Sequence, residues 1–350
     1  MKAIKFFAIS AMAAAMITSC SNEDELSQSN YPSDNIIRIT AGVNNAKTRA
    51  DETAGTPLKN PLSLTVVNNN TENTELAKKY TYVGKVFKKD ENEVWKCSET
   101  LLWQKATQAV DIVAFAPAVE NNPFANVYNN ETREFNGFSY SVAANQSQST
   151  AFDENDLLYN YTPNFTPGDQ NLDKDTKLDE NGKLNIKMNH AFCMIDIIVT
   201  LGTEFNVSGI PATSPITEVT LGGTKIDATV NVAAATDKIT ANSTAEAKDI
   251  TATPGAFTKP ENDDKEKSCI SNFSCITVPQ YVVENTFKVT LKTADKLYEW
   301  TSAEPVELKS GYRYTLELSM GNDVVLLKGG SISATPWTEA EISDNTLETE

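Results

Sequence analysis

The sequence predicts an all-β protein with two tandem β-sandwich domains behind an export signal. Short apolar runs recur along the chain, several of them with a period of two, and Asn, Gly, Pro and Asp residues separate them. No stretch keeps a helical period over three turns. Many short strands with turn signals between them are typical of sandwiches. A chain of 350 residues is long enough for two domains, each with its own core.

The first twenty residues are typical of a secretory signal. A basic start at residues 1–5 is followed by an apolar run at residues 6–17, which is too short to cross a bilayer. Small residues before Cys20 resemble the bacterial lipobox, in which the thiol is lipidated and the chain is cut just before it. We therefore predict a signal peptide over residues 1–19 and a lipid anchor on Cys20. The alternative is a plain signal peptide that happens to end near a cysteine.

Residues 20–34 are predicted to be a flexible lipidated leash, because residues 21–34 are polar and acidic and have no hydrophobic period. The whole chain carries a formal net charge of −17. A chain this acidic repels nucleic-acid phosphates and anionic lipid headgroups. We therefore expect no nucleic-acid partner.

The first predicted strand covers residues 36–43 and stands alone between the leash and the polar residues 44–56. Its residues alternate between two faces. One face carries Ile37, Ile39, Ala41 and Val43. The next clear strand is the apolar run at residues 110–116, which Pro117 ends, as expected for a buried strand.

Residues 162–182 contain Pro, Gly and several Asp residues, and we expect a long loop or the approach to a domain boundary there. We place the boundary so that the N-terminal domain covers residues 35–185 and the C-terminal domain covers residues 186–350. The apolar residues 189–201 are expected to form one long strand, and residues 219–221 lead into Gly222-Gly223, a hairpin signal. Residues 287–291 and 312–320 alternate with a period of two and are predicted strands with one buried face.

The sequence offers no constellation of catalytic or metal-ligating residues. The chain has one histidine, His190, which opens an apolar strand and is interpreted as a structural residue. No GxSxG elbow, CxxC pair or phosphate-binding glycine loop is present. The acidic residues 169–180 do not follow the EF-hand pattern. We therefore expect no enzyme activity, no metal site and no cofactor.

Cysteine usage is sparse for an exported protein. Cys193 lies in an apolar stretch and is expected to be a small core residue. Cys269 and Cys275 are close enough in sequence to close a small loop, and their disulfide state stays open at this point.

Several motifs then occur in a fixed order along residues 35–340. They are the strand at 36–40, Lys47-Thr48-Arg49-Ala50, Trp95, Leu102-Trp103, residues 110–117, residues 156–159, residues 189–195, Pro279-Gln280, residues 311–314 and Trp337. In this order, and together with the lipobox, they resemble the fimbrillin (Mfa-like) family of Bacteroidetes type V pilins.

The resemblance implies two transthyretin-like β-sandwich domains and a role as the shaft, tip or anchor subunit of a surface fimbria that serves cell adhesion. It also implies that the precursor reaches the outer membrane as a lipoprotein and that an arginine-specific protease removes the leader and the first strand. The opened groove then accepts a strand from the C-terminal region of the next subunit. The expected partners are therefore other fimbrial subunits, head to tail, and a host or bacterial surface receptor.

Carried onto this sequence, the resemblance makes residues 36–43 the displaced strand, with Ile37, Ile39, Ala41 and Val43 as its apolar face. Arg49, in a polar stretch, is the favoured cleavage site, and Arg38, inside the strand, is the lesser one. The candidate donor strand lies around a Gly329-Gly330 break, and it either folds back on its own domain or reaches a neighbour. Its candidate apolar residues are Val324, Leu326, Ile332 and Ala334.

A second hypothesis is a surface glycan-binding lipoprotein associated with polysaccharide uptake, with exposed aromatic side chains as sugar platforms. The candidate platforms are Trp95, Trp103, Trp300 and Trp337, although most tryptophans are core residues. A secreted hydrolase is a third and less favoured interpretation.

Overall fold

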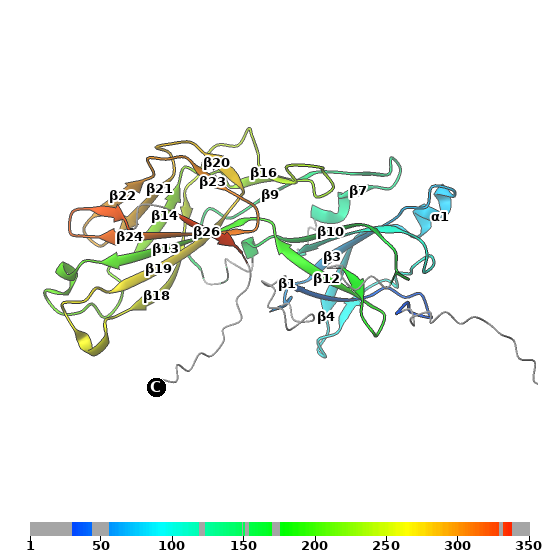
Figure 1. Ribbon diagram of the computed structural model, residues 1–350, viewed down its shortest axis with the longest axis horizontal. Helices are drawn as coiled ribbons and strands as arrows, with labels where there is room; N and C mark the ends of the chain where they lie inside the picture. Colours follow the sequence, from blue (N-terminus) through cyan, green and yellow to red (C-terminus); the bar gives the residue numbers. More distant parts are fainter. Residues whose placement is uncertain are drawn as a thin grey trace, which may run out of the picture.

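The computed structural model describes residues 30–43, 56–118, 123–148, 150, 154–169, 176–328 and 332–337. It is built almost entirely of β-strands, which form two lobes along the long axis of the molecule (Figure 1). The predicted all-β class is confirmed. Within the described residues, no helix is long and apolar enough to span a membrane.

Strands β1 to β6 and β10 to β12 make the principal sheet of the N-terminal lobe. Their bounds are β1 (Arg38–Val43), β2 (Thr56–Pro57), β3 (Leu62–Asn68), β4 (Tyr82–Lys89), β5 (Trp95–Cys97), β6 (Val110–Ala116), β10 (Leu158–Phe165), β11 (Lys177–Leu178) and β12 (Lys183–His190). A helix, α1 (Thr74–Lys79), a 3₁₀ turn, η1 (Pro123–Asn126), and the pair β7 (Tyr128–Asn129) and β8 (Glu134–Phe135) complete this part of the chain.

The C-terminal lobe has a larger sheet in the order β18-β19-β13-β24-β25, with β26 also paired to β24, and smaller sheets beside it. Its strands are β9 (Phe138–Ser141), β13 (Cys193–Leu201), β14 (Glu218–Gly222), β15 (Asp227–Val230), β16 (Ile239–Ala241), β17 (Ile250–Thr251), β18 (Thr253–Thr258), β19 (Ile270–Thr277), β20 (Gln280–Val282), β21 (Lys288–Lys292), β22 (Leu297–Thr301), β23 (Val306–Leu308), β24 (Tyr312–Met320), β25 (Val325–Leu327) and β26 (Ser333–Pro336). Short 3₁₀ turns are η2 (Thr203–Asn206) and η3 (Glu261–Asp263).

The sheet of the N-terminal lobe folds into two layers at β12. The first part of β12 pairs in parallel with β1, and its last residues pair with β10, where Leu158 lies opposite His190. Ile39 and Ile186 from one layer share a core with Leu64 and Ile112 from the other. The strand order, from β2 through β1, β12, β10, β6, β3 and β4 to β5, therefore encloses a hydrophobic core.

Strand β6 explains the unbroken apolar run of residues 110–116, because both of its faces are buried. Ile112 and Ala114 face the core of the N-terminal lobe. Val113 and Phe115 belong to the second core, where Phe115 stacks on Phe124 with ring centroids 4.6 Å apart. A strand covered on both faces reads as a continuous hydrophobic run rather than an alternating one.

The predicted alternation is confirmed in the C-terminal lobe. Along β24 the side chains of Tyr314, Leu316, Leu318 and Met320 are buried. Val289 and Leu291 are likewise buried on β21. These residues share one hydrophobic core with the buried residues of β13, which pairs with β24 in parallel.

The long strand expected over residues 189–201 is in fact two strands. His190 ends β12 and Cys193 begins β13, so the chain passes from one lobe to the other at Ala191 and Phe192. Both of these residues are fully buried, which keeps the hydrophobic run continuous across the junction.

The expected domain boundary between residues 185 and 186 falls inside β12. This strand pairs with β1, β10 and β11, so the strands of the N-terminal lobe extend to His190. Strand β9 departs from the expected division as well, because it pairs with β15 of the C-terminal lobe. The chain therefore enters the C-terminal lobe at β9, returns to the N-terminal lobe at β10, and leaves it after His190.

Two local expectations were wrong. Strand β10 continues through residues 162–165, which were expected in a loop, and its pairing with β6 shifts register between Thr162 and Phe165. Pro163 lies in this bulge, where a missing N–H is tolerated. Gly222-Gly223 does not close a hairpin, because β14 pairs with β17 and β21. Gly223 has φ +81°, and a Cβ there would lie 2.0 Å from Thr286 O.

Cys269 and Cys275 are free thiols rather than a disulfide. Both are buried, on and just before β19. Cys193 is a buried core residue, as expected, and burial raises the pKa of its thiol well above the ordinary value.

Candidate functional site

The first strand, β1, is an integral strand of the N-terminal lobe. It pairs in parallel with β12 from Arg38 opposite Lys183 to Val43 opposite Met188. Ile37, Ile39 and Val43 are only 4 to 5% exposed, and Ala41 is half-buried. The apolar face expected for this strand is therefore the face that packs into the core.

The other edge of β1 is paired over a short length. Strand β2 lies opposite Gly42 and Val43, and Leu58 N–H donates to Ala41 O at 3.3 Å. Nearer the start of the strand, Ile37 N–H donates to Leu101 O at 2.9 Å. Between these contacts, a groove of about 370 Å³ separates β1 from β5, and Ile39, Trp95 and Leu101 line it. Among the described strands, β12 is thus the only one that pairs with β1 over a long stretch.

Arg38 is held by an ion pair at the beginning of β1. Its guanidinium lies 2.6 Å from the carboxylate of Asp34, and Asp34 also accepts a hydrogen bond of 3.0 Å from Ile36 N–H. The hydrogen bond from Arg38 is the main cause that lowers the pKa of Asp34 to about 2. Arg38 is therefore fixed in a sheet, whereas Arg49 and Cys20 lie outside the described residues.

The C-terminal strands fold back on their own lobe. Both pair with the outer edge of β24: β25 with residues 318–320 and β26 with residues 312–315. The expected apolar face of β25 has the opposite phase, because Val325 is 7% exposed while Val324 and Leu326 are 50% and 59% exposed. Ile332 packs against the core at half-burial, and Ala334 is exposed.

Strand β26 is held by backbone pairing with β24 along its four residues and by the packing of the residue that follows it. Its residues Ser333–Pro336 are all exposed. The next residue, Trp337, stacks on His190 and donates from its backbone N–H to Gly311 O at 2.7 Å. His190 is buried and its Nδ1 lies 2.9 Å from the carboxylate oxygens of Asp156. The histidine thus has the structural position expected for it, at the junction of the two lobes.

None of the four tryptophans is an exposed platform for sugars. Trp103 is 2% exposed, with its ring 5.9 Å from that of Phe165. Trp95, Trp300 and Trp337 are half-buried and pack against the two cores. The side chains proposed for glycan binding from the sequence therefore contribute to the cores instead.

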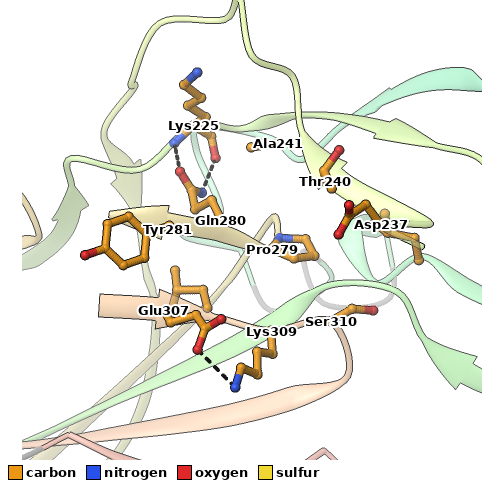
Figure 2. A pocket seen from close by; sticks show the side chains of 12 residues that line it. Lys225, Asp237, Thr240, Ala241, Pro279, Gln280, Tyr281, Glu307, Lys309 and Ser310 are labelled. Atoms are coloured by element: carbon orange, nitrogen blue, oxygen red, sulfur yellow. Dashed lines mark hydrogen bonds and ion pairs between the residues drawn. The ribbon is translucent and has the colours of Figure 1, made fainter. Parts of the chain in front are cut away.

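Sequence reasoning missed one exposed aromatic residue. Tyr281 is 65% exposed and lines a pocket of about 440 Å³ between β16, β20 and β23 (Figure 2). It lies between Gln280 and the buried Val282 on a very short strand. A tyrosine beside a buried valine on a short strand has no pattern that marks it as exposed, so the sequence carried no distinct signal for it.

In the part of the chain that the structure describes, no group of three or more His, Cys, Asp or Glu side chains is placed to hold a metal ion. Asp173 and Asp175, from the acidic residues 169–180, lie outside that part.

Comparison with known proteins gives one family. A family model described as fimbrillin-like matches residues 48–337. No curated protein matches the chain. A solved structure of a candidate cell adhesion protein from Bacteroides ovatus is similar, with 14% identity, a TM-score of 0.59, and coverage of 87% of this chain and 99% of that chain. Another, from Bacteroides uniformis, has 14% identity, a TM-score of 0.52, and coverage of 88% of this chain and 100% of that chain. At these identities the structural likeness shows the fold.

Proposed function

The chain belongs to the fimbrillin-like family, and we propose that it is a structural subunit of a type V fimbria on the bacterial outer membrane. We further propose that it assembles by protease-triggered donor-strand exchange and serves cell adhesion as a shaft, tip or anchor subunit. The observation that carries this proposal is β1: a six-residue strand with a buried apolar face and one long pairing partner, β12.

Loss of β1 creates an acceptor site. The edge of β12 from Lys183 to Met188 loses its parallel partner. The core side chains of Leu184, Ile186 and Met188 lose the β1 side chains that lie beside them. An unpaired edge above an apolar groove is a template for another strand. An incoming strand supplies backbone hydrogen bonds and places alternate side chains in the pockets that Ile37, Ile39 and Val43 leave.

Cleavage after Arg49 would release β1 without cutting the body of the lobe. The following strand, β2, begins at Thr56, so the site lies between the two strands in sequence. A protease binds its substrate as an extended, unpaired chain. Arg38 is the poorer substrate, because it is paired with Lys183 in the sheet and bonded to Asp34.

The C-terminal strands are the proposed donor. Strands β25 and β26 are short, lie at the edge of β24, and leave much of their surface exposed. Val325 of β25 is buried against its own lobe. Val324, just before the strand, and Leu326 are exposed and are therefore available to enter the groove of a neighbouring subunit. A head-to-tail contact of this kind does not close on itself, so repeated binding builds a filament.

The export signal completes the proposal. A lipid on Cys20 would hold the precursor at the outer membrane by its leash until cleavage separates the anchor from the body. The body needs no catalytic group for this task, and we propose no enzyme activity for it.

The assembly step is tested by truncation after Met320, which removes β25 and β26 but retains β24. The shortened chain should fold and reach the cell surface, and it should not elongate polymers when protease is added. SDS-resistant ladders from the truncated protein would contradict the proposed donor.

A crosslink locates the contact more closely. Ile186→Cys lies on β12 opposite Ala41 of β1, and Ala334→Cys lies on the exposed β26, so the pair should join two different subunits after cleavage at Arg49. The Ala334→Cys variant alone is the matched control for the native thiols. A crosslink within one chain only would place the donor strand elsewhere.

A further inference from the structure

We propose that the pocket between β16, β20 and β23 binds a short neutral glycan, one or two pyranose rings long, with Tyr281 as its stacking surface. The site lies on the C-terminal lobe between strands that are not assigned to assembly, and it gives the subunit a ligand of its own (Figure 2). Its volume of about 440 Å³ lies within the range of small-molecule sites, which is roughly 300–1,000 Å³.

Hydrogen bonds fix the strands that form the walls of this pocket. Tyr281 lies opposite Glu307 in the antiparallel pair of β20 and β23, and Ala241 N–H donates to Pro279 O at 3.0 Å, which joins β16 to the same site. Gln280 anchors the floor: its Oε1 accepts from Lys225 N–H at 2.8 Å, and its Nε2 donates to Lys225 O at 3.0 Å. A site built in this way is ready before a ligand arrives.

Tyr281 is the one large exposed aromatic side chain among the described residues. Its backbone neighbour Val282 is buried, so the ring projects from a fixed strand. An exposed ring of this kind can cover the apolar C–H face of a pyranose and keep its hydroxyl group in water.

Polar groups face the ring from the other side of the pocket. Figure 2 shows Asp237 and Thr240 across the pocket from Tyr281, with Ser310 below them. A carboxylate accepts hydrogen bonds, and a hydroxyl group both donates and accepts them. Asp237 and Thr240 therefore offer hydrogen-bonding groups to the hydroxyl groups of a sugar ring, whereas the Ser310 hydroxyl already donates to Ala191 O at 2.8 Å.

The charges in the pocket favour a neutral ligand. Lys309 Nζ is paired with Glu307 at 3.0 Å, and Lys225 Nζ donates to the carbonyl groups of Asn242 and Ser243. Both ammonium groups therefore have partners, and together with the carboxylates of Asp237 and Glu307 they give the pocket a formal net charge of zero. The pocket thus has no excess positive charge to attract an anion, and the net charge of −17 on the whole chain disfavours sialylated or phosphorylated glycans.

Saturation-transfer NMR on the full chain without its signal peptide tests the proposal. The probes are lactose, cellobiose, mannobiose and chitobiose at about 10 mM, a concentration suited to weak binding. At least one should receive saturation, and Tyr281→Ala should weaken its binding about tenfold. Val283→Ala is the matched control, because Val283 is also exposed, lies two residues away and is not among the lining residues.

No transfer to any of the four sugars would overturn the proposal, as would equal transfer in the Tyr281→Ala variant. Stronger transfer to sialyllactose than to lactose would overturn the neutral ligand class. Tyr281→Ala should still form polymers, so failure of the glycan site and failure of donor-strand assembly are separate results.

Discussion

The imidazole ring of His190 lies parallel to the indole ring of Trp337, with centroids 3.7 Å apart and planes 6° apart. The contact joins the end of β12, which carries the β1 pairing, to the residue that follows β26. The proposed acceptor strand and the proposed donor segment of one subunit are therefore in contact through this pair of rings.

Trp337→Ala should loosen β26 without unfolding the lobe. Loss of the stacked pair removes about 1 kcal/mol of local stability, so the amides of Ser333–Pro336 that can exchange should exchange several-fold faster. Hydrogen exchange followed by mass spectrometry measures this. Leu326→Ala, at an exposed position of β25, is the control and should leave exchange in β26 unchanged. Unaltered exchange in Trp337→Ala would show that the rings do not hold the strand.

Ile39→Ala should destabilise the uncleaved protein strongly. The side chain is 4% exposed inside the core that β1 covers, and such truncations cost about 2–5 kcal/mol. Urea unfolding of the N-terminal lobe measures the loss. Val94→Ala, which lines the neighbouring groove at 44% exposure, should change the free energy of unfolding by no more than about 0.5 kcal/mol. In a chain that begins at Ala50 the same core should be open to a donor peptide.

The Asp34–Arg38 pair should give the start of β1 an acid-sensitive contact. The pKa of Asp34 is lowered to about 2, chiefly by the hydrogen bond from Arg38. A lowered carboxyl pKa stabilises the fold above its ordinary value, near ~3.9, and that contribution is lost as the pH falls toward about 2. Asp34→Asn should therefore be less stable than the native chain at pH 5, and the difference should shrink toward pH 2. A difference that is constant with pH would refute the linkage.

The cysteine thiols should react at different rates according to how deeply each is buried. Cys193, Cys269 and Cys275 are buried, and burial raises the pKa of each thiol, so they should react slowly with Ellman's reagent in the folded protein. The half-buried Cys97 should react first. After denaturation all of the thiols should react without a reductant, which a Cys269–Cys275 disulfide would prevent.

The sequence determined the fold class and the main strands. The alternation of residues 312–320 and the apolar run of residues 110–116 predicted β24 and β6, because a half-buried strand and a fully buried strand leave different hydrophobic patterns. The amphipathic residues 36–43 likewise identified the first strand and its buried face before any partner was known.

Only the tertiary structure decided which partners these strands meet. Val324 and Leu326 had the alternation of a buried face, yet the edge of β24 buries Val325 instead, since a period of two defines two faces and packing selects between them. The passage between the lobes at Ala191 and Phe192 is as apolar as a strand and carries no local mark of a boundary. The pocket beside Tyr281 is formed by β16, β20 and β23, which are distant in sequence, and side chains that meet only through long-range pairing leave no local pattern.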